Sequence, residues 1–250
     1  MLTRPDIFVV HGALGSAAQM QPVADALMEV GSVHAVELPG HGNTPLGNAP
    51  FAMGTFTDAL AAAVELRASE RRNDALRMHA RIDSVAPIVF GYSMGGYIAL
   101  ALEAKHPCTF GGIVTLGTKF LWTPEYAATE SVRWDADTIA MKVPKFAGEL
   151  EERHAAAGGW HSVLANMANM MRELGDSPVL TRSVLASVRV PVCVVSGDHD
   201  STVSYEETRE VATWMPHATP LKVLDTPHPI ERVQTALIVD LLRKIGGDYL

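Results

Sequence analysis

Ser93 lies in the segment Gly91-Tyr-Ser-Met-Gly-Gly96, between the apolar run 87–90 and an apolar stretch, 97–105, that is typical of a helix. This pattern predicts a strand, a sharp turn and a helix, with the serine at the turn. The flanking glycines allow strand and helix to approach closely, because they have no side chain. A hydroxyl at the start of a helix lies near backbone N–H groups that stabilise negative charge. The segment therefore predicts a serine nucleophile.

A base and an acid that could activate this serine follow it along the chain. His228 comes after the last apolar run, and Asp198 and Asp200 follow the run 190–196. A histidine can take the proton of a serine hydroxyl, and a carboxylate fixes the histidine tautomer and stabilises the charged ring. The two aspartates compete for that role. In chain order the groups are serine, acid and histidine.

Short β-branched runs alternate with longer helical stretches over most of the chain. We expect strands over 7–10, 33–38, 88–92, 112–116, 190–196 and 221–224. We expect helices over 16–30, 56–70, 94–105, 205–214 and 230–245, with 71–83 as an exposed extension of the second. This alternation predicts an α/β fold with a mostly parallel, doubly wound sheet, and the continuous apolar strands suit burial on both faces. Ligands of such sheets bind at the carboxyl ends of the strands.

The stretch 119–185 has no strand signal and holds three of the four tryptophans. Helical pieces are expected near 124–132, 137–146, 145–157 and 160–174. Such a connection is far longer than an ordinary crossover. We therefore expect residues 119–185 to form a helical cap on a core made of residues 1–118 and 186–250. Extra helix on a face of the sheet is the alternative.

Composition and charge exclude several classes of protein. A hydrophobic content of 48% with 19% charged residues describes an ordinary globular protein. The net charge of −8 argues against nucleic acid or an anionic membrane surface as a partner. No apolar run approaches the length of a membrane span, and the first residues lack the features of a signal peptide, so we expect a cytoplasmic protein. Cys108 and Cys193 are too few for a disulfide framework and are expected as buried free thiols.

The sequence offers no support for metal or cofactor chemistry. None of the ten histidines forms the helical pair typical of catalytic zinc sites, and the turn that holds the acid explains His199. The glycines at 12, 15, 40 and 42 do not form a dinucleotide-binding fingerprint. We therefore expect neither a metal ion nor a cofactor.

The chain resembles the α/β-hydrolase superfamily, in particular its serine-nucleophile, esterase-like members with a helical cap. The resemblance begins at residue 6 and rests on motifs that follow one another in the family's order: His11-Gly12, 38–42, 91–96, 197–200 and His228. Members of this family usually have two further strands before the His-Gly strand, whereas here that strand starts at residue 6. We therefore expect the strand 33–38 to be the edge of the sheet. An uncovered edge invites pairing, so we expect either a homodimer or a compensating cover.

The resemblance implies a catalytic triad of Ser93, His228 and Asp200, because the third residue after Gly197 points toward the histidine in this family. Asp198 would then be a turn residue. The oxyanion hole would be formed by the backbone N–H groups of Ala13 and Met94. His11 and His41 are expected to be structural, with His11 bonding the loop that presents Ala13.

An apolar substrate pocket is expected where the cap meets the site. Its candidate residues are Leu14, Lys119, Trp122, Trp134, Trp160 and Met170. Each of the apolar ones could instead belong to the core of the cap.

These features predict a hydrolase that cleaves a carboxylic ester, thioester or lactone through an acyl-enzyme. The substrate would be a small molecule with a carbonyl group, and the sequence does not name it. A carbon–carbon hydrolase or lyase on the same triad is an alternative, in which Lys119 would anchor a substrate carboxylate unless it is simply solvated. A second alternative is a ligand-binding, receptor-like protein with a vestigial site.

Overall fold

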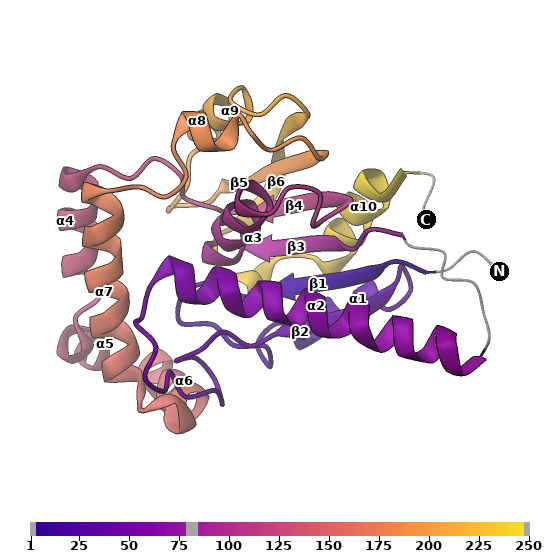
Figure 1. Cartoon of the computed structure of the whole chain (residues 1–250). Helices are drawn as coiled ribbons and strands as arrows, with labels where there is room; N and C mark the ends of the chain where they lie inside the picture. Colours follow the sequence, from indigo (N-terminus) through magenta and orange to yellow (C-terminus); the bar gives the residue numbers. More distant parts are fainter. Residues whose placement is uncertain (1–3, 79–84, 248–250) are drawn as a thin grey trace.

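A fully parallel sheet of six strands forms the centre of the molecule in the computed structural model, which describes residues 4–78 and 85–247 (Figure 1). The strands are β1 (Asp6–Val10), β2 (Ser32–Val36), β3 (Ile88–Tyr92), β4 (Gly112–Leu116), β5 (Val192–His199) and β6 (Ala218–Pro227). They lie in the order β2-β1-β3-β4-β5-β6. The predicted parallel sheet is confirmed, and β2 forms one edge of it, as predicted.

Helices cover both faces of this sheet. One face packs against α1 (Gln21–Leu27) and α10 (Thr235–Gly246). The other packs against α2 (Met53–Met78), α3 (Met94–Lys105) and α9 (Tyr205–Ala212). Every residue of β1, β3 and β4 is buried as a result, which explains why these strands read as continuous apolar runs.

Several boundaries differ from the sequence prediction. Helix α1 begins at Gln21 instead of residue 16, because Pro22 is tolerated only in the first turn of a helix. Ser16 instead accepts a hydrogen bond from the Gln19 amide in the turn before the helix, at 3.2 Å. The second helix continues through the predicted extension to Met78, and residues 79–83 of that extension lie outside the described residues.

The edge strand β2 ends at Val36, two residues earlier than predicted, and most of its residues are half-buried. A shallow groove of about 320 Å³ lies between this strand and α2. The expected homodimer or compensating cover stays a prediction.

The two cysteines are free, but only Cys193 is half-buried. Cys108 is exposed, contrary to expectation, because it lies in the turn that follows α3. Within residues 4–78 and 85–247, no helix combines the length and the apolar character needed to cross a bilayer.

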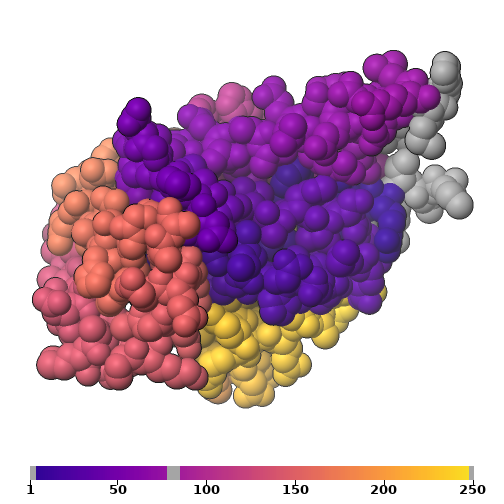
Figure 2. Space-filling model, turned by 90° about the horizontal axis from the view of Figure 1, so that it is seen from below, coloured from indigo at the N-terminus to yellow at the C-terminus, as the bar shows by residue number. Residues whose placement is uncertain are grey.

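The helices between β4 and β5 form a helical insertion. They are α4 (Pro124–Val132), α5 (Ala136–Lys142), α6 (Pro144–His154), α7 (Trp160–Asp176) and α8 (Arg182–Leu185). Pro144 ends the overlap that the sequence predicted between the second and third pieces, because proline fits the first turn of α6 and cannot continue α5. Figure 1 shows α4–α7 beyond the carboxyl ends of the strands. Figure 2 shows the insertion at one end of the molecule, against segments from the N-terminal part of the chain.

The closest packing in the sheet lies where β3 turns into α3. A Cβ atom on Gly91 would lie 2.4 Å from the backbone nitrogen of Gly96. A Cβ atom on Gly95 would lie 2.2 Å from the carbonyl oxygen of Val10. Both positions therefore need glycine, and the missing side chains let the helix begin directly against β1 and β3.

We expect Gly95→Ala to lower the free energy of unfolding by about 3 kcal/mol, because the added methyl group forces a backbone shift in a packed core. Gly148→Ala is the matched control, since an added Cβ on this exposed residue of α6 meets nothing within 4 Å. It should raise the free energy of unfolding by about 0.5–1 kcal/mol. Urea denaturation measures both values, and equal effects of the two substitutions would contradict the packing argument.

Candidate active site

Ser93 occupies the turn between β3 and α3 in a conformation that few residues other than glycine adopt, with φ 52° and ψ −117°. Its neighbours on β4 and beyond hold this backbone in place. The Ser93 amide donates to the carbonyl of Leu116 at 2.8 Å, and the hydroxyl of Thr118 donates to the Ser93 carbonyl at 2.8 Å. The serine is thus presented at the carboxyl edge of the sheet, at the N-terminus of a helix.

The other two candidate groups of the triad meet at the ends of β5 and β6. His228 Nδ1 donates to Asp200 Oδ2 at 2.9 Å, since the carboxylate can only accept. Asp198 Oδ1 instead accepts from the amide of Thr226 at 3.3 Å. Of the two aspartates, it is therefore Asp200 that contacts the histidine. This tautomer leaves Nε2 of His228 free to act as a base.

The carboxylate of Asp200 is held in its charged form. Burial alone would raise its pKa, but hydrogen bonds from His228 and from the amides of Thr202 and Val203, at 2.8 and 3.0 Å, outweigh that effect. The net result is a pKa below the usual value of 3.8. A buried carboxylate that stays ionised can stabilise a protonated imidazole beside it.

Two residues that the sequence prediction missed support the histidine. The Tyr92 hydroxyl donates to the His228 carbonyl at 3.0 Å, and the centres of the two rings are 5.5 Å apart. Gly117, at φ 64°, leaves room for the pair, because a Cβ atom there would lie 3.0 Å from Asp200 Oδ2 and 3.1 Å from His228 Nδ1. The only sign of this role in the sequence is that Gly117 directly follows the apolar strand 112–116.

Ser93 and His228 line the same cavity, which has a volume of about 390 Å³. Ala13 and Met94 line it beside the serine. A Cβ atom on Gly12 would lie 3.0 Å from the Cβ of Ser93, so the loop after β1 passes very close to the serine.

The walls of the cavity are mostly apolar and come largely from the insertion. Five of the predicted pocket residues line it: Leu14, Lys119, Trp122, Trp134 and Met170. Trp160 is not among the lining residues and is buried in the apolar core instead. Other apolar residues also line it: Met53, Ile139, Phe146, Met167, Met171 and Leu174.

A family model matches residues 3–226, almost the whole chain, and describes the Hydrolase_4 family, serine aminopeptidase, S33. The chain belongs to this family of α/β hydrolases. The pimeloyl-[acyl-carrier protein] methyl ester esterase of Aromatoleum aromaticum is 26% identical over an alignment of 255 residues with gaps. The alignment covers 91% of this hydrolase and 92% of that protein. The biotin biosynthesis bifunctional protein BioHC of Cellvibrio japonicus is 32% identical over 128 residues, which cover 50% of this hydrolase and only 21% of that protein.

Solved structures agree on the fold. A thermophilic esterase from Thermogutta terrifontis has a TM-score of 0.73 at 20% identity and covers 98% of this hydrolase and 92% of that chain. The enol-lactonase from Burkholderia xenovorans has a TM-score of 0.70 at 21% identity, with coverage of 96% and 92%. The predicted resemblance to α/β hydrolases is confirmed. At these identities the likeness concerns the fold alone.

Lys119 of this hydrolase is engaged inside the protein. Its ammonium pairs with the buried carboxylate of Glu207 on α9 and lies 4.2 Å from the centre of the Tyr126 ring. The same carboxylate accepts hydrogen bonds from the amides of Phe120 and Leu121, at 2.7 and 2.9 Å. This lysine therefore helps attach the beginning of the insertion to the core. This contact does not support the alternative in which Lys119 anchors a substrate carboxylate.

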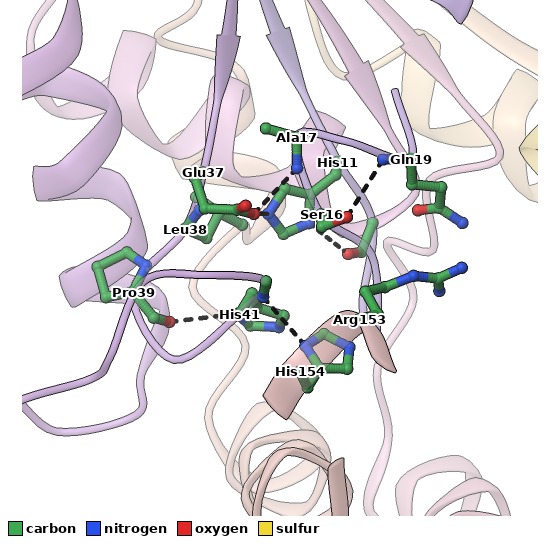
Figure 3. Close-up of polar contacts among 12 residues, drawn as sticks. His11, Ser16, Ala17, Gln19, Glu37, Leu38, Pro39, His41, Arg153 and His154 are labelled. Atoms are coloured by element: carbon green, nitrogen blue, oxygen red, sulfur yellow. Dashed lines mark hydrogen bonds and ion pairs between the residues drawn. The ribbon is translucent and has the colours of Figure 1, made fainter. Parts of the chain in front are cut away.

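Three buried histidines of the hydrolase, His11, His41 and His154, lie together below the loop after β1 (Figure 3). His11 Nδ1 contacts the Gly12 carbonyl at 2.8 Å, and its Nε2 accepts from the Leu38 amide at 3.2 Å. His41 Nδ1 contacts the Pro39 carbonyl at 3.2 Å, and His11 Nε2 also lies 3.3 Å from the Glu37 carboxylate. In the described part of the chain, no three His, Cys, Asp or Glu side chains are grouped to hold a metal ion.

Burial, together with the neighbouring His11 and His154, lowers the pKa of His41 from 6.5 to about 3, although the hydrogen bond with the Pro39 carbonyl acts in the opposite direction. Below about pH 6.5 the unfolded chain therefore binds a proton that the folded hydrolase does not bind. The free energy of unfolding should fall as the pH falls. This histidine alone accounts for about 2 kcal/mol between pH 7 and pH 5.

His41→Asn keeps a donor near Nδ1 and removes the titrating ring. We expect its stability to fall less steeply than that of the wild type between pH 7 and pH 5. Urea denaturation at both pH values measures the slope. Identical slopes for the two proteins would show that this histidine does not titrate as described.

Proposed function

We propose that this hydrolase cleaves carboxylic esters through an acyl-enzyme formed on Ser93. One observation supports the proposal most strongly: a serine in a strained turn and a histidine bound to a buried aspartate face one apolar cavity. The relatives named above support the ester bond, because they include a methyl ester esterase that this chain covers over 92% of its length.

In the proposed reaction, Nε2 of His228 takes the hydroxyl proton as Ser93 Oγ attacks the substrate carbonyl. The resulting oxyanion accepts hydrogen bonds from the amides of Ala13 and Met94. The tetrahedral intermediate collapses, and the histidine gives its proton to the leaving alcohol. Water, activated by the same histidine, then attacks the acyl-enzyme and releases the acid. Asp200 stabilises the charged ring in both halves of the cycle.

The substrate class follows from the cavity. Its volume of about 390 Å³ lies within the usual range for small-molecule sites, and its walls are mainly apolar side chains of the insertion. We therefore propose an ester with an apolar acyl chain. The charged groups at the cavity, among them Glu130, Arg133 and Glu231, suit a substrate that also carries a polar group.

Ser93→Ala should lower kcat for p-nitrophenyl butyrate by at least about 10³-fold, because the nucleophile is lost. Ser183→Ala, at an exposed serine of α8, is the control and should leave the rate unchanged. A fluorophosphonate should label Ser93 stoichiometrically, whereas a vestigial site would stay unlabelled.

An amino-acid p-nitroanilide in the same assay tests amide cleavage, which the family description suggests. The ester proposal would be contradicted if the anilide were cleaved in a Ser93-dependent way while no p-nitrophenyl ester with an acyl chain of two to eight carbons was cleaved.

Asp200→Asn should lower kcat by about 10⁴-fold, because the amide favours the wrong histidine tautomer. Asp198→Asn is a matched control two residues away, and its carboxylate contacts only the Thr226 amide among the hydrogen bonds of the described residues. We expect it to keep activity within about threefold of the wild type. A comparable loss in both variants would indicate a folding defect of the turn, and circular dichroism would reveal it.

A further inference from the structure

Arg153 and His154, at the end of α6, reach from the insertion toward the loop after β1 (Figure 3). Arg153 Nη1 donates to the carbonyl oxygen of Leu14 at 2.8 Å. His154 Nε2 contacts the same oxygen at 3.1 Å, and its Nδ1 accepts from the Gly42 amide at 3.1 Å. A backbone N–H can only donate, so Nδ1 is unprotonated and the hydrogen on Nε2 points to Leu14. Burial also lowers the pKa of His154, which maintains this neutral form.

The carbonyl that receives both hydrogen bonds belongs to a strained residue. Leu14 has a φ of 55°, a conformation that leucine rarely adopts. It lies in a turn that is closed by a hydrogen bond of 3.1 Å from the Gly15 amide to the Gly12 carbonyl. Two donors from the insertion, the charged guanidinium of Arg153 and the imidazole of His154, thus hold this carbonyl in place.

The same turn contains Ala13. On the core side, His11 bonds the Gly12 carbonyl at 2.8 Å, and on the insertion side Arg153 and His154 bond the carbonyl of Leu14. The Leu14 carbonyl shares a planar peptide unit with the Gly15 N–H, which donates to the Gly12 carbonyl at 3.1 Å. The Gly12 carbonyl in turn shares a planar peptide unit with the Ala13 N–H. Holding the Leu14 carbonyl therefore helps to fix the direction of the Ala13 N–H group.

We propose that Arg153 and His154 are positioning residues for the oxyanion hole, because their hydrogen bonds to Leu14 hold the loop that presents the Ala13 amide. The inference rests on the proposed function, which assigns Ala13 to that hole. On this inference the insertion has two roles: it forms a wall of the substrate cavity, and its contact with the loop is needed for stabilisation of the transition state. The competing explanation is that His154 merely ties the insertion to the loop at Gly42.

Two substitutions of one residue separate these explanations. His154→Gln places an amide near the position of Nε2 and can still donate to Leu14. His154→Asn places its amide near Nδ1, so it can still accept from Gly42 but cannot reach Leu14. Arg153→Met removes the other donor to the same carbonyl. His161→Asn, at an exposed histidine of α7, is the control.

The assay compares a p-nitrophenyl ester with its thiono analogue, in which sulfur replaces the carbonyl oxygen. Sulfur is a weak acceptor and gains little from an oxyanion hole. We expect His154→Asn and Arg153→Met to lower kcat for the oxygen ester by about 10-fold or more, with KM changed less than about twofold. The thiono ester should be affected far less. His154→Gln and His161→Asn should remain near the wild type.

The labelling rate of Ser93 by a fluorophosphonate gives a second readout that needs no ester turnover, because the phosphoryl oxygen occupies the same hole. It should fall in His154→Asn and not in His154→Gln. Equal losses on oxygen and thiono esters, or a larger loss in His154→Gln than in His154→Asn, would overturn the inference. Ester turnover that disappears in Ser93→Ala supports the proposed function independently, so such a result would leave that function standing.

Discussion

The contact between the start of α3 and the strands β1 and β3 determines where Ser93, the proposed nucleophile, must lie. Because no Cβ atom fits at Gly91 or Gly95, the helix begins almost on the backbone of its neighbours. The chain can make so sharp a turn only if Ser93 adopts a positive φ. Two hydrogen bonds offset the strain at this residue. The Ser93 amide donates to the carbonyl of Leu116, the last residue of β4, and the hydroxyl of Thr118, just after β4, donates to the Ser93 carbonyl. The serine is therefore part of the packing of the sheet.

The parallel arrangement brings the remaining groups to the same edge. Parallel strands all present their carboxyl ends on one side, so the loops after β1, β3, β5 and β6 meet there. The pairing of β5 with β6 shifts register between Gly197 and His199, just before the aspartate that contacts His228. Such an irregularity re-aims the following side chains. It accounts for the different partners of the two aspartates, which are only two residues apart.

Much of this arrangement could be predicted from local patterns. The strands 88–92 and 112–116 and the helix 94–105 agree with the structure at both ends, because buried apolar runs bounded by turn residues define them. The sequence could not distinguish Trp160, which packs in the core, from Trp122, which lines the cavity. Both are apolar residues of an insertion whose helices are placed only by tertiary contacts.

Polar contacts between distant segments were equally hidden from the sequence. His154 meets the loop at Leu14 across 140 residues, and Glu207 meets the start of the insertion across 86 residues or more. No local propensity or spacing marks such partners, because each side chain is an ordinary helix residue when taken by itself. The structure is needed to show that both attach the insertion to the core.

The Glu207 carboxylate has a consequence for exchanging parts between enzymes of this fold. It is buried, and its oxygens are satisfied by Lys119 and by two backbone amides of the residues that lead into the insertion. A buried carboxylate that loses such partners is strongly destabilising. A foreign lid grafted between β4 and β5 would therefore need to reproduce this entry segment, with its lysine and its backbone path, or the graft would have to replace the glutamate on α9 as well.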